Sequence, residues 1–198
     1  MKIGIIGLGR VYKHYEKNFI QSLLNDKHSL YLFDSNKSKF NSLDISYNHK
    51  RVLSIDEIIN EKIDFAIIAT PSGSHYEITK ELLNNGINVL TEKPATMMEN
   101  ELNELIHIAK KSSLKYGVIF QNRLNPAIKV AKSLVDNNYL GDIKICSFKL
   151  HWCRFQNYYD DEWHGTWKMD GGVINQQAIH HLDAMHWING PFSSVIAS

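Results

Sequence analysis

The stretch KIGIIGLGRVY (residues 2–12) decides the fold, because it joins a short apolar run to a glycine turn near the start of the chain. In a strand–turn–helix unit of this kind, one glycine permits the tight turn and a second lets the backbone approach the pyrophosphate of a dinucleotide. Gly7 and Gly9 stand at these two positions. Tyr12 stands where a third glycine or alanine is usual, so the motif is weak when taken alone.

Asp34 strengthens the dinucleotide hypothesis. It ends the second apolar run, at about the spacing expected for a ribose contact. A carboxylate there accepts hydrogen bonds from the ribose hydroxyls and repels a 2′-phosphate, which favours NAD over NADP. The start of the first helix, at Arg10 and Val11, would offer N–H groups to the phosphates. The alternative is a plain glycine turn with a solvated aspartate.

Short apolar runs alternate with amphipathic stretches over residues 1–121, which is typical of a doubly wound parallel sheet covered by helices. We therefore predict an α/β fold with an NAD-binding Rossmann domain at residues 1–121. Ser54 with Glu57 and Thr96 with Glu99 fit the capping box, and Gly86 marks a helix end. The predicted strands are Lys2–Ile6, Leu30–Asp34, Phe65–Thr70, Asn88–Glu92 and Tyr116–Phe120.

The pattern changes in residues 122–198. A helix is predicted from Pro126 to about Asp136, a long strand at Asp142–Arg154 and a second helix at about Val173–Ile188. Ser194–Ala197 resembles the opening of another strand. One long strand and the start of another are too few for a sheet. We therefore expect a truncated α+β domain for substrate binding and oligomerisation, and a homo-oligomer if the missing sheet is supplied.

Composition excludes several classes of function. The net charge of +1 argues against a nucleic-acid binder that relies on a basic surface. No apolar run approaches the roughly 20 residues of a membrane span. The N-terminus lacks the features of a signal peptide, and a count of two cysteines argues against a disulfide framework, so we expect a cytoplasmic protein. Ten histidines are present, but no two of them have the i, i+4 spacing by which helices bind zinc, so we expect no metal.

Several short motifs together resemble the glucose–fructose oxidoreductase / inositol dehydrogenase (Gfo/Idh/MocA) family. They are Gly7-Leu8-Gly9-Arg10, the loop Thr70-Pro71-Ser72-Gly73-Ser74-His75, Glu92-Lys93-Pro94, and Gly171-Gly172 ahead of a histidine-bearing helix. The resemblance implies an NAD-dependent oxidoreductase. The loop taken by itself reads equally well as an ordinary strand-to-helix connection. Beyond the glycine turn and Asp34, the cofactor contacts implied are Thr70, Pro71, Ser72, His75, Glu92, Lys93 and Gln121.

Other segments resemble, more narrowly, the UDP-N-acetylglucosaminuronic acid 3-dehydrogenases of surface-polysaccharide synthesis. They are residues 121–126, 154–160, 163–167 and 170–172. The guanidinium group of an arginine can donate two parallel hydrogen bonds, which suits both the pyrophosphate and the carboxylate of such a substrate. Each of the polar residues in these segments could equally make a surface or inter-domain contact. The substrate contacts implied are Lys93, Asn122, Arg123, Asn125, Arg154, Gln156, Tyr158, Tyr159, Gln176 and His180.

Two residues are predicted to be catalytic. Oxidising a secondary alcohol needs a base for the hydroxyl proton and a cation near the developing alkoxide. The resemblance assigns the cation to Lys93 and the base to His180. Gln176, His180 and Asp183 share a helix face by spacing. Gln176 stands where the family has an acidic residue, so His180 should be less basic, and the amide would orient substrate.

The leading hypothesis is oxidation of the C3 hydroxyl of UDP-N-acetylglucosaminuronic acid, with NAD as cofactor. The first alternative is a dehydrogenase for another sugar or a cyclitol. The second is a truncated, non-catalytic dinucleotide-binding module.

Overall fold

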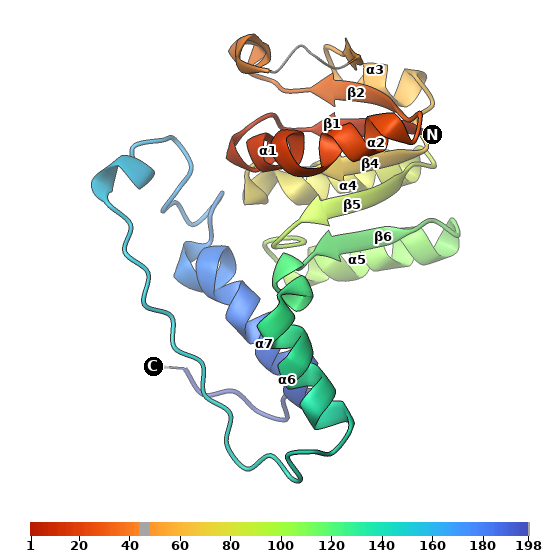
Figure 1. The fold of residues 1–198 in the computed structure, drawn as a ribbon. Coiled ribbons are helices and arrows are strands. Elements are labelled where there is room, and N and C mark those ends of the chain that lie inside the picture. The colour runs from red at the N-terminus through yellow and green to blue at the C-terminus, as the bar shows by residue number, and fades with distance from the viewer. Residues whose placement is uncertain (44–47, 198) are drawn as a thin grey trace.

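The computed structural model describes residues 1–43 and 48–197, and at its centre lies a six-stranded sheet with helices on both faces (Figure 1). The strand order is β3-β2-β1-β4-β5-β6, and every neighbouring pair is parallel. This is the doubly wound Rossmann order, with its switch point between β1 and β4, so the predicted fold is confirmed. The strands are β1 (Lys2–Ile6), β2 (Ser29–Phe33), β3 (His49–Arg51), β4 (Phe65–Ile68), β5 (Asn88–Glu92) and β6 (Tyr116–Ile119).

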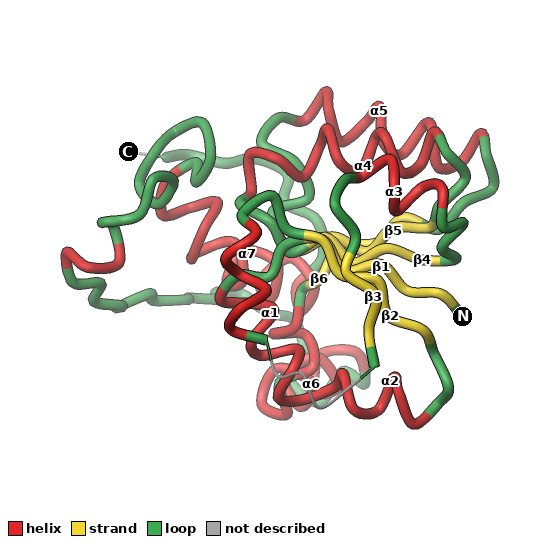
Figure 2. The backbone as a smooth tube through the Cα atoms, turned by 90° about the horizontal axis from the view of Figure 1, so that it is seen from above, coloured by secondary structure: helices red, strands yellow, loops and turns green. Residues whose placement is uncertain are grey.

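Two apolar cores form because alternate strand residues point to opposite faces of the sheet. One core, around Ile6 and Ile68, lies beneath α3, α4 and α5, and the other, around Ile5 and Leu32, lies beneath α1 and α2 (Figure 2). Within the described residues, no helix has the length and apolar character needed to cross a bilayer. The α-helices are α1 (Arg10–Tyr15), α2 (Gln21–Asn25), α3 (Ile55–Asn60), α4 (His75–Asn84), α5 (Glu99–Lys111), α6 (Pro126–Asp136) and α7 (Ile179–Asn189).

Short 3-10 and π-helical segments connect several of these elements. They include the π-helix that links α1 to α2 and the π-helix that runs directly into α7. They are η1 (Glu16–Ile20), η2 (Lys37–Ser42), η3 (Ser72–Ser74), η4 (Gln121–Leu124), η5 (Gln156–Tyr158) and η6 (Ile174–Ala178).

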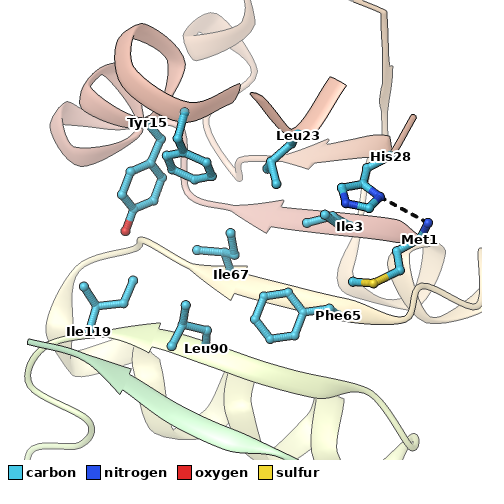
Figure 3. Close-up of a pocket in the computed structure, with 10 residues that line it drawn as sticks. Met1, Ile3, Tyr15, Leu23, His28, Phe65, Ile67, Leu90 and Ile119 are labelled. Carbon is cyan, nitrogen blue, oxygen red and sulfur yellow. Dashed lines mark hydrogen bonds between the residues drawn. The ribbon is translucent and has the colours of Figure 1, made fainter. Parts of the chain in front are cut away.

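An apolar hollow of about 450 Å³ lies between the α1–α2 layer and the sheet (Figure 3). Phe19 and Leu23 form its helix side, and Phe65, Leu90 and Ile119 reach it from β4, β5 and β6. Its lining includes no predicted site residue. Tyr15, one of its lining residues, donates to Glu92, so the hollow adjoins the candidate site.

Most predicted helix ends agree with the structure. Ser54 caps α3 by accepting a bond from the Glu57 N–H at 3.1 Å, and Gly86, with φ +78°, follows the end of α4. The capping box predicted for Thr96 and Glu99 is wrong. Helix α5 begins at Glu99, with Met98 as its cap residue. Thr96 lies two residues before this cap position, and its hydroxyl donates to the Met98 carbonyl at 2.8 Å.

The strand predicted at Asp142–Arg154 is not formed, and neither is the one predicted at 194–197. The sequence pattern of both segments predicts an extended backbone. Within residues 1–43 and 48–197, however, no strand pairs with either of them. An isolated strand leaves its backbone N–H and C=O groups bonded only to water, so alternation of apolar residues does not by itself make a sheet. Residues 142–155 instead run as a long extended loop past the helices (Figure 1).

Helices α6 and α7 pack side by side below the sheet (Figure 1). Helix α6 starts at Pro126, as predicted, and the Asn125 side chain caps it by accepting from the Ala127 N–H at 2.9 Å. The second predicted helix is present, but it opens as the π-helix η6 before becoming regular in α7. Gln176 lies within η6, and its carbonyl accepts from Lys93, the residue that directly follows β5.

Candidate cofactor and substrate site

The glycine turn after β1 depends on Gly7 for its shape. Gly7 has φ +96° and donates its N–H to the Phe33 carbonyl at 2.9 Å. A Cβ at this position would lie 2.6 Å from the backbone of Ala69. At Gly9, by contrast, a Cβ would meet nothing within 4 Å, so the space above the second glycine is open. Because a phosphate needs such close access to backbone N–H groups, the turn fits the pyrophosphate of a dinucleotide.

Alanine substitutions at the two glycines should affect different properties, folding stability at Gly7 and NAD affinity at Gly9. We expect Gly7→Ala to lower the free energy of unfolding by about 2–5 kcal/mol. The alanine would have to adopt a positive φ, and its Cβ would clash with the backbone of Ala69. Gly9→Ala should unfold like the wild type yet bind NAD on the order of tenfold more weakly, because its methyl group occupies the open space. Urea denaturation and fluorescence titration with NADH measure the two effects. Equal stabilities for the two variants would contradict this reading of the turn.

Asp34 lies beside the same turn, directly after β2. One carboxylate oxygen accepts the Leu8 N–H at 2.7 Å, and the other accepts the Asn36 N–H at 2.8 Å. These two bonds hold the carboxylate against the turn, and its remaining lone pairs are free to accept ribose hydroxyls. Asp34 thus supports the turn, and its contact with the ribose stays a prediction.

We expect Asp34→Ala to weaken NAD binding about ten- to a hundredfold more than NADP binding, because only the unphosphorylated ribose can donate to the carboxylate. Loss of the Leu8 bond disturbs the turn equally for both cofactors. The informative quantity is therefore the ratio of the two dissociation constants, measured by titration. An unchanged ratio would show that Asp34 only shapes the turn.

The buried side chain of His75 holds the loop after β4 in place. This ring is 1% exposed, and its nitrogens lie 2.7 Å from the Pro94 carbonyl and 2.9 Å from the Thr70 carbonyl. The ring thus ties the loop of β4 to the turn after β5. Ser72 is also buried, so the part of this loop left for a cofactor is the backbone and side chains around Thr70 and Pro71.

Glu92, the last residue of β5, is buried and already has partners. Its Oε1 accepts the Tyr15 hydroxyl at 2.5 Å, and its Oε2 accepts the Lys93 N–H at 3.3 Å. Burial and the carboxylate together raise the pKa of Tyr15 far above its usual range. Glu92 therefore anchors the end of β5 to α1 and fixes the point at which Lys93 leaves the sheet.

Lys93 reaches across to the helical half of the molecule. Its Nζ donates to the Gln176 backbone carbonyl at 2.7 Å and to the Gln176 Oε1 at 3.0 Å. Burial lowers the pKa of Lys93, while the nearby charges of Glu92 and Asp170 oppose that shift. The lysine and η6 are thus joined directly, although 83 residues separate them in sequence.

His180 follows Gln176 by four residues, at the start of α7. Its ring is 6% exposed, and its Nδ1 has no hydrogen-bond partner among the residues that the structure describes. Burial first, and then the positive charge of Lys93, lower the pKa of His180 to about 4. The imidazole is therefore neutral at pH 7 and less basic than usual. Burial and neighbouring charges cause this, and the effect expected from Gln176 stays a prediction. Because the charge of Lys93 contributes to this shift, the two groups lie near each other.

The predicted substrate residues around η4 contribute mainly to the framework. Arg123 forms a two-pronged pair with Asp183, with Nε–Oδ2 at 2.8 Å and Nη2–Oδ1 at 2.5 Å, which ties η4 to α7. A substrate anion would have to compete with that carboxylate. The Asn122 carbonyl accepts the Asn125 N–H at 3.0 Å, and Gln121 is exposed at the start of η4.

A second group of predicted substrate residues gathers around Tyr158, together with Arg10, which is predicted to contact the cofactor. The guanidinium carbons of Arg10 and Arg154 lie 5.0 and 5.3 Å from the centre of its ring. Tyr159 packs edge-on against Tyr158 at 5.0 Å between ring centres. Gln156, also in η5, donates to Asp160 at 3.4 Å.

Sequence reasoning missed three residues that organise this region: Tyr15, Asp170 and Gln177. Asp170 is 3% exposed and accepts the Gly165 N–H at 2.8 Å, and Gln177 donates to the Tyr158 hydroxyl at 3.3 Å. The Asp-Gly-Gly run was a usable signal for Asp170. Nothing local marks Tyr15 or Gln177, because their partners are distant in sequence.

Comparisons with known proteins agree with this architecture. Residues 1–120 match a family model described as an oxidoreductase family with an NAD-binding Rossmann fold. Residues 128–198 match the GFO/IDH/MocA C-terminal domain. An uncharacterised oxidoreductase of Synechocystis is 30% identical over 164 residues, covering 81% of this chain and 43% of its own length. Glucose-6-phosphate 3-dehydrogenase of Bacillus subtilis is 25% identical over 193 residues, covering 94% and 53%.

Two solved structures are also similar. The WlbA dehydrogenase of Bordetella pertussis, in complex with NADH and UDP-GlcNAcA, has a TM-score of 0.89 at 26% identity. WlbA of Chromobacterium violaceum, with the same two ligands, has a TM-score of 0.88 at 27% identity. Each match covers 96% of this chain and 56% of the other. The present chain thus spans about half the length of the relatives that it matches.

Proposed function

Because the chain belongs to the Gfo/Idh/MocA oxidoreductase family, with an NAD-binding Rossmann fold at residues 1–120, we propose that it oxidises a sugar hydroxyl with NAD. The observation that carries the proposal is the junction of Lys93 and His180. Lys93 directly follows β5 and donates to Gln176, and His180 lies in the first turn of α7, four residues after Gln176. Residues 1–121 would hold the cofactor, and residues 122–198 would contribute the substrate contacts.

The chemistry follows from the charges at this junction. The substrate hydroxyl must lose its proton, and His180, neutral at pH 7, accepts it. The Lys93 ammonium, fixed by Gln176, stabilises the negative charge that develops on the same oxygen. NAD, when bound on the glycine turn, supplies the acceptor for the hydride. Gly7, Gly9, Asp34 and the backbone around Thr70 would hold it.

We propose UDP-N-acetylglucosaminuronic acid, oxidised at C3, as the substrate. The support is the likeness to two dehydrogenases solved with NADH and UDP-GlcNAcA, together with the arginines and tyrosines near Tyr158. Such a substrate would place the enzyme in cytoplasmic nucleotide-sugar synthesis for a surface polysaccharide. A homo-oligomer is part of the same proposal.

The test is an assay of NAD reduction by the purified chain. We expect NADH to form with UDP-N-acetylglucosaminuronic acid and not with free inositol or glucose. Turnover with glucose 6-phosphate alone would favour another sugar dehydrogenase, in line with the Bacillus subtilis relative. NADH binding without turnover of any of these compounds would identify a non-catalytic dinucleotide-binding module.

A further inference from the structure

Asp170 has a buried carboxylate whose two oxygens differ in their partners. The side chain is 3% exposed, and its Oδ2 accepts the Gly165 N–H at 2.8 Å. Its Oδ1 is buried as well, and no hydrogen-bond donor reaches it within residues 1–43 and 48–197. Burial of a carboxylate is costly unless an opposite charge compensates it. The environment of Asp170 should therefore contain a cation.

The backbone next to Asp170 packs where the end of β5 meets η6. A Cβ at Gly171 would lie 2.6 Å from Cε of Met97 and 2.5 Å from Nδ2 of Asn175. Met97 belongs to the turn between β5 and α5, and Asn175 belongs to η6. Asp170 is thus held beside the two segments that the Lys93–Gln176 hydrogen bonds join.

Lys93 is the cation on which the charge of Asp170 acts. Burial lowers the pKa of Lys93, and the charges of Glu92 and then of Asp170 oppose that change. The two carboxylates are not equivalent, because Glu92 already accepts from the Tyr15 hydroxyl and from the Lys93 N–H. In the part of the chain that the structure describes, Lys93 and Asp170 form no ion pair within 4 Å, so the attraction acts across a gap.

Two histidines also face Lys93. His75 belongs to α4 and His180 to α7, and the positive charge of Lys93 contributes to lowering the pKa of each. Burial is the larger cause for both imidazoles, and both are neutral at pH 7. Neither adds a positive charge beside the lysine. The charge state of Lys93 is therefore set by burial on one side and by the two carboxylates on the other.

We propose that Asp170 is a positioning residue whose buried carboxylate keeps Lys93 in its ammonium form at the junction with Gln176. Only the ammonium form can stabilise the negative charge that develops on the substrate oxygen. Asp170 acts through Lys93 and needs no contact with the substrate. The inference rests on the proposed function for what Lys93 does to the substrate, but the interaction between the two charges does not depend on it.

The rate at which acetic anhydride acetylates Lys93 in the folded chain tests this interaction, because only the neutral amine reacts. Asp170→Asn keeps the size of the side chain and an oxygen for the Gly165 N–H, and removes the charge. We expect Lys93 to react about tenfold faster in this variant, with its rate profile displaced to lower pH. Peptide mass spectrometry gives the rate, and Lys129, exposed on α6, is the internal reference.

Asp161→Asn is the matched control. Asp161 precedes Asp170 in the same loop and also accepts a backbone N–H, that of His164, at 2.9 Å. Its charge is not among those that act on Lys93. Acetylation of Lys93 in this variant should stay within about twofold of the wild type.

Urea denaturation gives a second readout, which needs no labelling. Lys93→Met leaves the Asp170 carboxylate buried without its cation, so its urea midpoint should fall below that of the wild type. Adding Asp170→Asn removes the uncompensated charge and should raise the midpoint of Lys93→Met, although it should not raise that of the wild type. An aspartate that only holds the Gly165 N–H would have the same effect in both backgrounds.

Any of three results would overturn the inference. They are acetylation of Lys93 that is no faster in Asp170→Asn, an equal acceleration in Asp161→Asn, and equal effects of Asp170→Asn on the two urea midpoints. None of these measurements requires turnover. A chain in which Asp170 controls the reactivity of Lys93 but which oxidises no sugar would refute the proposed function and leave the role of Asp170 standing.

Discussion

Replacing Lys93 with methionine should lower the rate of hydride transfer by a factor of about 10²–10⁴, while NADH binding stays within about twofold of the wild type. Methionine keeps an unbranched side chain but removes the charge that would stabilise the developing alkoxide. It also removes the donor for the Gln176 carbonyl, at 2.7 Å, so some loosening of η6 is expected. Single-turnover measurement of nicotinamide absorbance gives the rate, and fluorescence titration gives the affinity.

Lys129→Met is the matched control for this variant, because Lys129 is exposed on α6. It should be as active as the wild type. A Lys93→Met enzyme that also turns over normally would remove this lysine from the mechanism. A variant that instead loses NADH binding would make Lys93 a cofactor ligand and not a catalytic group.

Replacing His180 with asparagine should have a comparable effect on hydride transfer, about 10²–10⁴, again with NADH binding retained. Asparagine is polar but cannot accept a proton near neutral pH. Because the pKa of His180 is about 4, the wild type should keep its base in the neutral form well below pH 7. Protonation of this histidine should therefore not lower the rate of the wild type at pH ~6.5.

The same pKa predicts how stability depends on pH. In the unfolded chain His180 takes up a proton near pH ~6.5, whereas in the folded chain it does so near 4. Between these values the unfolded state binds more protons, so the contribution to stability is complete above pH ~6.5 and is lost as the pH falls towards 4. The shift corresponds to about 3 kcal/mol. Urea denaturation at about pH 7 and about pH 4.5 should show this loss in the wild type and a smaller one in His180→Asn.

The sheet could be predicted from sequence because its strands are buried on both faces and read as apolar runs. The predicted strand Asn88–Glu92 and the start of α6 at Pro126 agree with the structure to the residue. Strand β3 was missed because His49–Arg51 is a short polar edge strand with no apolar pattern of its own. The segment 142–154 has the alternation of a strand, but pairing depends on a partner that local sequence does not encode.

The candidate site was predictable to the extent that it follows motifs at strand ends. The motifs led to Gly7, Asp34, Lys93 and His180. The first three directly follow β1, β2 and β5, which are parallel strands of one sheet, so they lie at the same edge of it, and His180 lies in the first turn of α7. The contacts that position them were not predictable. The bond of Lys93 to Gln176 spans 83 residues, and its acceptor lies in the π-helix η6, for which the sequence carries no local signal.

A crystal structure of this chain with bound NADH would test the central claim most directly. The account predicts that the pyrophosphate lies over Gly9, that Asp34 binds the adenosine ribose, and that the nicotinamide ring lies beside both the Lys93 ammonium and the His180 imidazole. A nicotinamide ring bound away from these two side chains, with the dinucleotide still held by the glycine turn, would contradict it.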